Sequence, residues 1–187
     1  MASRFLDLGY DVLEGLIDPG QIAFARKAMD FSHANGRMQR ATKPSTEFGW
    51  EEYGPVAGEV LLRHCLPRIA AIAGEELLPT YAFWRIYEAG AELLVHRDRP
   101  SCEISATLMI AAEPEEQGWP IWVRDLEGTE VPVSLRPGSA VVYQGRKVYH
   151  WRERYAGQKH YQVFLHYVRK NGKYADFAHD GRPALNA

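Results

Sequence analysis

The chain has few cysteines, and they form no motif. Only Cys65 and Cys102 occur among 187 residues, and there is no C-x-x-C pair. Two cysteines are too few for the disulfide framework of a small secreted domain. The absence of a C-x-x-C motif also excludes a zinc ribbon and a thioredoxin-type redox motif. Both thiols are therefore expected to be reduced and at least half-buried, as in a cytoplasmic protein.

Long apolar runs and a strong charge of either sign are also missing. The net charge is −2, and no segment approaches the length of a membrane-spanning helix. No overall field attracts phosphate backbones or anionic lipids, so neither nucleic acid nor a membrane is expected as a partner. The start of the chain shows no secretory signal, which favours a cytoplasmic location. Nothing in the sequence indicates the oligomeric state.

The length and an ordinary content of hydrophobic (46%) and charged (25%) residues suit one globular domain over residues 1–187. We expect a helical front at 1–78 with a long loop at 37–53, a β-rich body at 79–170, and a loosely ordered tail at 171–187. An N-cap followed by proline and a 3.6-residue apolar period predict a helix over 18–36. A second helix is predicted over 56–73, kinked or split by Pro67.

After Pro79 the sequence changes to short apolar runs separated by turn signals. Seven short strands of this kind favour a sandwich or barrel, and helices before a β-body give an α+β fold with a double-sheet core. The predicted strands are 81–87, 103–112, 120–125, 131–135, 139–143, 148–151 and 160–168.

A candidate metal site lies in His96-Arg97-Asp98 and the more distant His150. In a strand, residues i and i+2 project to the same side, so this tripeptide aims an imidazole and a carboxylate together. Two histidines and one carboxylate leave coordination positions open, which suits iron(II) binding an oxoacid and O₂. Structural zinc sites more often close around four ligands. The tripeptide alone arises often by chance, so the surrounding sequence decides.

Three further segments support the site. Tyr87 and Gly90 precede His96 in the pattern Y-x-x-G-x-x-x-x-x-H-x-D, and residues 131–143 form a strand, a Pro-Gly turn and an apolar strand that lead to His150. Gly157-Gln158-Lys159 then follows as G-x-R/K. In this order, over about residues 80–170, the chain resembles the 2-oxoglutarate/Fe(II)-dependent oxygenase superfamily, particularly its prolyl-4-hydroxylase-like branch.

The resemblance implies a double-stranded β-helix (jelly-roll) core with the N-terminal helices packed on one sheet. It implies that His96, Asp98 and His150 bind iron(II), that Lys159 pairs with the C5 carboxylate of 2-oxoglutarate, and that Tyr87 donates a hydrogen bond in the same pocket. A buried carboxylate requires such a partner. No catalytic residue beyond the metal centre is assigned.

The choice of Lys159 depends on strand register. Alternation along the strand places Lys159 on one face with Tyr161, Val163 and Leu165, which favours Lys159 over His160. A slip of one residue in the register would exchange the two faces. Arg152 or Arg154 could replace it as the carboxylate partner, although a solvated face shared with Glu153 is the simpler interpretation of both.

Two other positions bear on the pocket. Arg85 shares a face with Tyr87, so it could anchor 2-oxoglutarate or a substrate carboxylate, or it could be an edge-strand charge. Leu93 stands where relatives often have a tyrosine that touches the oxoacid, so that contact is missing or supplied by another group. Because Asp98 is retained, oxygen insertion or desaturation is favoured over halogenation.

The implied activity is that of a dioxygenase that uses O₂, with ascorbate as a candidate reductant. It would hydroxylate an unactivated C–H bond of a small molecule, amino acid or peptidyl residue, with release of succinate and CO₂. The alternatives are a cupin-like metal-binding isomerase or sensor without 2-oxoglutarate turnover, a zinc hydrolase, and a protein–protein module whose interface includes Trp50 and Tyr53.

Overall fold

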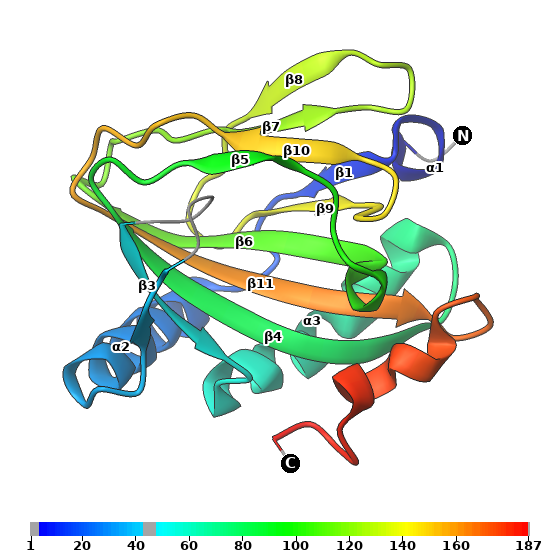
Figure 1. Cartoon of the computed structure of the whole chain (residues 1–187), viewed down its shortest axis with the longest axis horizontal. Coiled ribbons are helices and arrows are strands. Elements are labelled where there is room, and N and C mark those ends of the chain that lie inside the picture. The colour runs from blue at the N-terminus through cyan, green and yellow to red at the C-terminus, as the bar shows by residue number, and fades with distance from the viewer. Residues whose placement is uncertain (1–3, 43–47, 187) are drawn as a thin grey trace.

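The structure, a computed structural model, describes residues 4–42 and 48–186. Two antiparallel sheets lie face to face, and the two long helices cover the outer face of the larger sheet (Figure 1). This arrangement of helices and antiparallel sheets confirms the predicted α+β class. No helix in the described part of the chain is long and apolar enough to cross a membrane.

The helices begin and end where the sequence signals place them. After the short α1 (Arg4–Leu8), α2 (Pro19–Ala34) begins at a capping box in which the Asp18 side chain accepts from the Gln21 backbone N–H and Gln21 accepts from the Asp18 N–H. The second long helix, α3 (Val56–Ala73), ends at a left-handed Gly74, which closes the last turn.

Of the two outcomes predicted for Pro67, a kink or a split, the split does not occur. The helix runs unbroken through this residue, which lies on its exposed side. The carbonyl one turn earlier, which loses its intrahelical donor, belongs to the exposed Arg63, where water can replace the missing hydrogen bond. The buried side of α3 carries Leu61, Cys65, Ile69 and Ala73 at four-residue spacing, and these side chains hold it on the sheet.

The larger sheet has the strand order β1-β9-β6-β11-β4-β3-β2, and the smaller has the order β5-β10-β7-β8. Two 3₁₀ segments, η2 (Pro100–Cys102) and η3 (Ala175–Gly181), complete the chain. The strands are β1 (Tyr10–Leu13), β2 (Gln39–Arg40), β3 (Gly49–Tyr53), β4 (Leu77–Glu88), β5 (Leu93–His96), β6 (Ile104–Glu113), β7 (Ile121–Arg124), β8 (Glu130–Val133), β9 (Ala140–Tyr143), β10 (Tyr149–Arg152) and β11 (Lys159–Arg169).

The two faces of β11 differ in chemistry. Tyr161, Val163, Leu165 and Tyr167 belong to the apolar core beneath the helices, where the Tyr167 hydroxyl donates to the Leu62 carbonyl at 2.8 Å. The alternate side chains point toward the smaller sheet; they are His160, Gln162, Phe164 and His166. The strand therefore separates an apolar core from a more polar interior between the sheets.

Four strands were not predicted, and two lie in the segment expected to be a loop. Within 37–53, β2 and β3 extend the larger sheet, while residues 43–47 lie outside the described part of the chain. Because β3 is polar and short, its sequence lacks the apolar alternation of a strand. It is fixed by pairing with β4, which brings Glu51 to the guanidinium of Arg85 as an ion pair. The other two unpredicted strands are β1 and β5.

The C-terminal tail was expected to be loosely ordered, but it makes specific contacts in the structure. Asp180 accepts two hydrogen bonds from Arg99, at 2.9 and 2.7 Å. Arg182 donates to the buried carboxylate of Glu59 at 2.6 Å. These charged contacts attach residues after β11 to η2 and α3, and tertiary partners of this kind are invisible to local sequence patterns.

The packing of α3 on the sheet gives a stability prediction. Leu62→Ala removes a fully buried side chain and is expected to lower the free energy of unfolding by about 2–5 kcal/mol. The matched control is Val60→Ala on the same helix, where the side chain is 61% exposed, with an expected change within about 0.5 kcal/mol. Urea denaturation followed by circular dichroism measures both, and equal losses would contradict this packing.

Candidate metal centre

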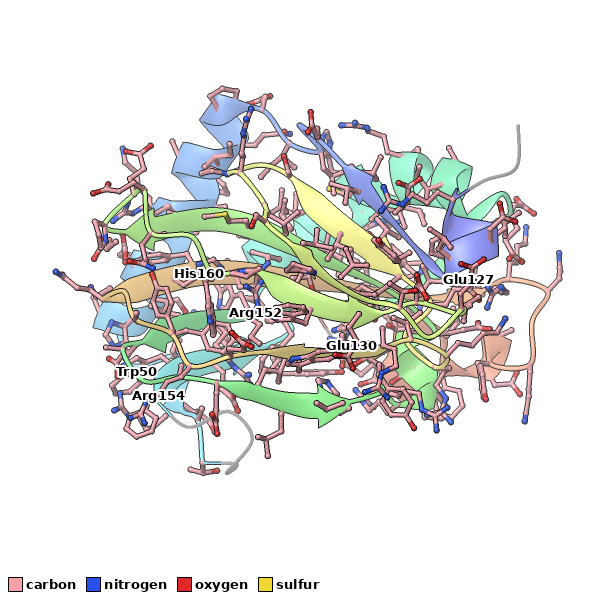
Figure 2. The ribbon with its side chains drawn as sticks, turned by 90° about the horizontal axis from the view of Figure 1, so that it is seen from above. Trp50, Glu127, Glu130, Arg152, Arg154 and His160 are labelled. Atoms are coloured by element: carbon pink, nitrogen blue, oxygen red, sulfur yellow. The ribbon has the colours of Figure 1, made fainter. Side chains whose placement is uncertain are left out.

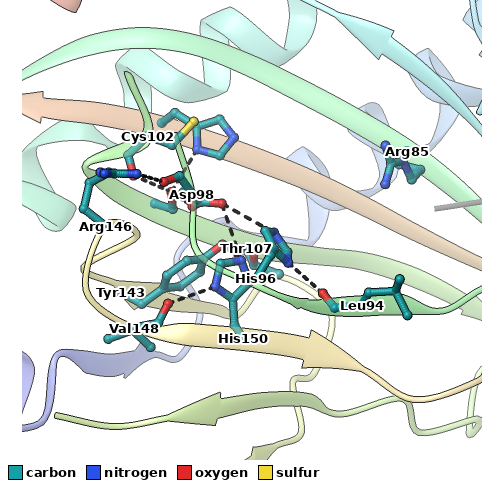
Figure 3. Close-up of polar contacts among 12 residues, drawn as sticks. Arg85, Leu94, His96, Asp98, Cys102, Thr107, Tyr143, Arg146, Val148 and His150 are labelled. Carbon is teal, nitrogen blue, oxygen red and sulfur yellow. Dashed lines mark hydrogen bonds and ion pairs between the residues drawn. The ribbon is translucent and has the colours of Figure 1, made fainter. Parts of the chain in front are cut away.

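Two histidines lie opposite each other on neighbouring strands. His96 at the end of β5 and His150 in β10 are register partners, and their ring centroids are 4.2 Å apart. Asp98 follows His96 by two residues; its Oδ1 lies 3.7 Å from His96 Nε2 and 3.5 Å from His150 Nε2 (Figure 3). The three candidate ligand atoms lie within 4.8 Å of one another. The structure thus brings the predicted triad together.

Backbone carbonyls fix which nitrogen each histidine presents. His96 Nδ1 lies 2.8 Å from the Leu94 carbonyl oxygen, and His150 Nδ1 lies 3.3 Å from the Val148 carbonyl oxygen. A carbonyl only accepts, so Nδ1 carries the proton in each ring and donates to it. Nε2 is left without a proton and directed toward Asp98, which is the arrangement of metal-binding histidines.

The electrostatics favour the protonation states that a metal requires. Burial lowers the pKa of His96, and the neighbouring His150 lowers it further. Burial by itself would raise the pKa of the Asp98 carboxyl. At the acidic pH where this group titrates, the positive charge and hydrogen bond of His150, the charge of His166 and the hydrogen bond from Ser105 lower the pKa to about 2. At neutral pH the site therefore has a neutral His96 and an ionised Asp98, and neither must lose a proton to bind a cation.

A cavity of about 590 Å³ adjoins the triad and opens to solvent. Leu94 and Val95 of β5, each 51% exposed, lie on its rim, and aromatic side chains of the larger sheet form much of its wall. The residues that line it are Tyr81, Phe83, Arg85, Tyr87, Leu93, Leu94, Val95, His96, Arg97, Asp98, Arg99, Cys102, Thr107, Ile121, Tyr143, His150, Phe164 and His166. A metal held by the triad would face this space.

A buried cation lies further along the strand of the second histidine. Arg152 is two residues after His150 in β10, where alternation places both side chains on the buried face, and it is 3% exposed. Figure 2 shows it near His160 of β11. Its guanidinium donates to the Trp119 carbonyl and to Gln162 Oε1. It has no carboxylate partner among the described residues. Burial lowers its pKa to about 10, so it remains cationic at neutral pH.

The groups around Arg152 are incompletely satisfied. Gln162 uses its oxygen to accept from Arg152 and from His160, while its buried Nε2 has no hydrogen-bond partner among the residues that the structure describes. Burial and the nearby Arg152 lower the pKa of His160 to about 3, so that ring is neutral. A buried guanidinium and an adjacent unpartnered amide N–H together provide the surroundings that a carboxylate needs.

The other predicted carboxylate partners are placed differently. Neither Lys159 nor Arg152 is among the residues that line the cavity. Arg152 is buried beside it, whereas the Lys159 side chain is 45% exposed and lies 3.9 Å from Glu113. Lys159 does share a face of β11 with the odd-numbered residues, as predicted, but that face packs against the helices and not toward the smaller sheet. Arg154 is exposed. Arg85 lines the cavity beside the Tyr87 hydroxyl, but its charge is already paired with Glu51.

Several polar residues of the interior were missed by the sequence analysis. Ser105 and Thr107 of β6 alternate with apolar residues and face the smaller sheet, beside Tyr143 and His166. Small polar residues at i and i+2 in an otherwise apolar strand are the signal that could have identified a site-facing side.

Comparison with known proteins identifies the fold. No protein-family model and no curated protein sequence matches the chain. Among solved structures, a Pseudomonas putida prolyl-4-hydroxylase matches at 16% identity and a TM-score of 0.71, over 89% of this chain and 95% of that one. The epimerase SnoN, in complex with Fe³⁺ and alpha-ketoglutarate (2-oxoglutarate), matches at 17% identity and a TM-score of 0.72, over 89% and 81%.

EctD from S. alaskensis with bound Fe matches at 14% identity and a TM-score of 0.70, over 99% of this chain and 86% of that one. SnoN binds Fe³⁺ and alpha-ketoglutarate in its structure, EctD binds Fe, and the third neighbour is a prolyl-4-hydroxylase, which agrees with the resemblance found in the sequence. At these identities the similarity establishes that the chain has their fold.

The buried histidines predict a pH dependence of stability. Burial, with smaller charge effects, lowers the pKa of His160 to about 3 and that of His166 to about 4, whereas the unfolded chain has a value of about 6.5. Between these values only the unfolded state binds the proton, so stability should fall as the pH is lowered from about 6.5 to about 4, by about 1.4 kcal/mol per pH unit for each histidine. Urea denaturation of metal-free protein across this range measures the slope. His160→Gln should make it shallower, and an unchanged slope would contradict the assignment.

Proposed function

We propose that the chain is an iron(II)- and 2-oxoglutarate-dependent dioxygenase in which His96, Asp98 and His150 hold the iron. The observation that carries this proposal is the geometry of the triad: two imidazole nitrogens and one carboxylate oxygen within 4.8 Å of one another, beside an open cavity. This donor set, with positions left open, is the one that suits a non-haem iron. The two facing sheets would then be the halves of a double-stranded β-helix.

We assign the C5 carboxylate of 2-oxoglutarate to Arg152 in place of Lys159. Among the described residues, Arg152 is a buried cation without an acidic partner, and it lies in the same interior as Tyr87 and Tyr143, with which it interacts electrostatically. Leu93 of β5 is the register partner of Arg152, and it lines the cavity next to the triad. A buried guanidinium gains most from a carboxylate that can accept two of its hydrogen bonds. Tyr87 keeps its predicted role as a hydrogen-bond donor near the oxoacid.

When bound, iron with 2-oxoglutarate and O₂ supplies an oxidant that removes hydrogen from a C–H bond, with succinate and CO₂ as co-products. The chain's own residues bind and orient the reactants. His96, Asp98 and His150 would hold the metal, and Arg152 would pair with the far carboxylate of the oxoacid. Tyr81, Phe83 and Phe164, which line the cavity, would shield one side of it from water.

Hydroxylation is the outcome we propose, on a small molecule, an amino acid or a peptidyl residue. The retained Asp98 keeps the third protein ligand, and the similar structures include prolyl hydroxylases. They also include an epimerase and a carbocyclase, so the assay must score co-product release and substrate change separately. Arg85, on the cavity wall and paired with Glu51, is the proposed contact for a polar group of the substrate.

The first test is turnover of 2-oxoglutarate. Purified protein with iron(II), ascorbate, 2-oxoglutarate and O₂ should release succinate even without substrate, and a metabolite and peptide library should contain compounds that accelerate the release. His96→Ala and Asp98→Ala should each reduce it to background, because two remaining ligands hold iron weakly. Release that persists in both variants, or no release and no 2-oxoglutarate binding by the parent protein, would leave the cupin-like alternative.

Arg152 gives a separate prediction for 2-oxoglutarate binding. Arg152→Gln should raise the Kd for 2-oxoglutarate by at least about 30-fold, because loss of one partner of a buried ion pair costs about 2–5 kcal/mol. Arg152→Lys keeps the charge but not the planar fork, so its Kd should lie between those of the parent protein and Arg152→Gln. Isothermal titration with Mn(II) in place of iron measures all three without turnover.

Lys159→Ala is the matched control, because this lysine is a cation close in sequence whose side chain lies outside the interior. It should bind 2-oxoglutarate as the parent protein does. A large loss in Lys159→Ala together with normal binding in Arg152→Gln would return the role to Lys159.

A further inference from the structure

The two oxygens of the Asp98 carboxylate have different surroundings. Oδ1 faces the Nε2 atoms of His96 and His150, at 3.7 and 3.5 Å. Oδ2 points the other way and accepts a hydrogen bond from the Ser105 hydroxyl at 2.6 Å. The carboxylate therefore directs a single oxygen to the candidate metal position, while its second oxygen is bound to the protein.

The Ser105 hydroxyl is itself held in place. Ser105 is fully buried in β6, and its register partner in β11 is His166. The hydroxyl oxygen lies 2.9 Å from His166 Nδ1. A hydroxyl has one proton, and a charged carboxylate is the stronger acceptor. Ser105 therefore donates to Asp98 and accepts from the Nδ1–H of His166.

The His166 ring cannot turn freely to release this contact. It lies 4.6 Å from the Tyr81 ring and is parallel to the Phe164 ring at a centroid distance of 6.4 Å. These neighbours lie on β4 and on β11 itself. The chain from His166 through Ser105 to Asp98 is thus fixed by packing at the end farthest from the metal.

The backbone of Asp98 is fixed by the turn between β9 and β10. Its N–H donates to the Gly145 carbonyl at 2.9 Å, and its carbonyl accepts from Arg146 at 2.6 Å. A Cβ at Gly145 would lie 2.6 Å from Asp98 Oδ2, so only glycine leaves room for the carboxylate. With the backbone held, the main remaining freedom is rotation of the carboxylate, and the Ser105 contact opposes that rotation.

We propose that Ser105, supported by His166, is a positioning residue that restricts Asp98 to one-oxygen coordination. A carboxylate can bind a metal through one oxygen or two, and a second oxygen would occupy a position that the oxoacid or O₂ needs. The hydrogen bond to Ser105 keeps that oxygen away from the metal. This inference rests on the proposed iron centre and concerns residues outside the triad.

Cobalt(II) binding to the metal-free protein tests the proposal without turnover. Ser105→Ala should weaken Co(II) affinity by about 10- to 100-fold, the range found when partners of metal ligands are removed. Its Co(II) absorption spectrum should also change, because a freed Asp98 can coordinate through both oxygens. Ser105→Thr keeps the hydroxyl and should restore the parent spectrum and most of the affinity.

Two further substitutions separate positioning from loss of packing. Thr80→Val removes another fully buried hydroxyl, which donates to the Ser101 carbonyl at 2.8 Å and does not contact Asp98. This variant should lose thermal stability but keep the parent Co(II) affinity and spectrum. At position 166, His166→Asn keeps a donor near the place of Nδ1, whereas His166→Leu removes it, so the leucine variant should resemble Ser105→Ala more closely.

The outcomes distinguish the two proposals. If His96→Ala and Asp98→Ala abolish Co(II) binding while Ser105→Ala and His166→Leu retain the parent affinity and spectrum, the triad stands and the positioning role is overturned. If His96→Ala leaves Co(II) binding intact, the proposed iron site itself fails. Thiolate-to-cobalt absorption would place the metal in the overlapping group Asp98, Cys102 and His166, and would overturn both.

Discussion

The candidate site depends on the pairing of two short strands of the smaller sheet. His96 of β5 lies opposite His150 of β10, and the two rings meet only because the strands pair in this register. The third group, Asp98, is held by the turn that leads into β10, through its hydrogen bond to Gly145. A shift of one residue in either strand would turn an imidazole to the outer face of the sheet. The pairing of β5 with β10 thus determines whether the candidate ligands can meet.

The larger sheet provides what the smaller one cannot, which is a rigid support with two chemically distinct faces. Helix α3 covers one face with an apolar core, and β11 extends across the middle of the sheet. On the other face, polar side chains such as Ser105, Gln162 and His166 are almost completely buried. Burial of polar groups is costly unless they are hydrogen-bonded. Their hydrogen bonds to one another and to Asp98 or Arg152 reduce that cost and fix their orientation.

The polar interior has two regions, one around the triad and one around Arg152, which differ in how well their polar groups are paired. Near the triad, Asp98 accepts a hydrogen bond from Ser105, and the Nδ1 atoms of His96 and His150 have backbone carbonyl partners. Around Arg152, a full positive charge lacks an acidic partner among the described residues and Gln162 Nε2 lacks any partner. A satisfied region suits a metal that requires fixed ligands, and an unsatisfied one suits a ligand that brings its own charge. The proposed iron and oxoacid sites differ in just this respect.

The sequence by itself determined the long helices and most strands of the β-body, because each is encoded by local spacing. It indicated the candidate ligands through the i, i+2 pair His96 and Asp98 together with the family resemblance, which added His150. The i, i+2 rule that joined His96 to Asp98 also links His150 to Arg152, so the buried arginine was within reach of the same argument. Tertiary structure decided which face of β11 is inside, and so removed Lys159 from the interior and placed His166 behind Asp98. Alternation gives two faces but does not say which one a second sheet will cover, because that depends on packing between segments distant in the chain.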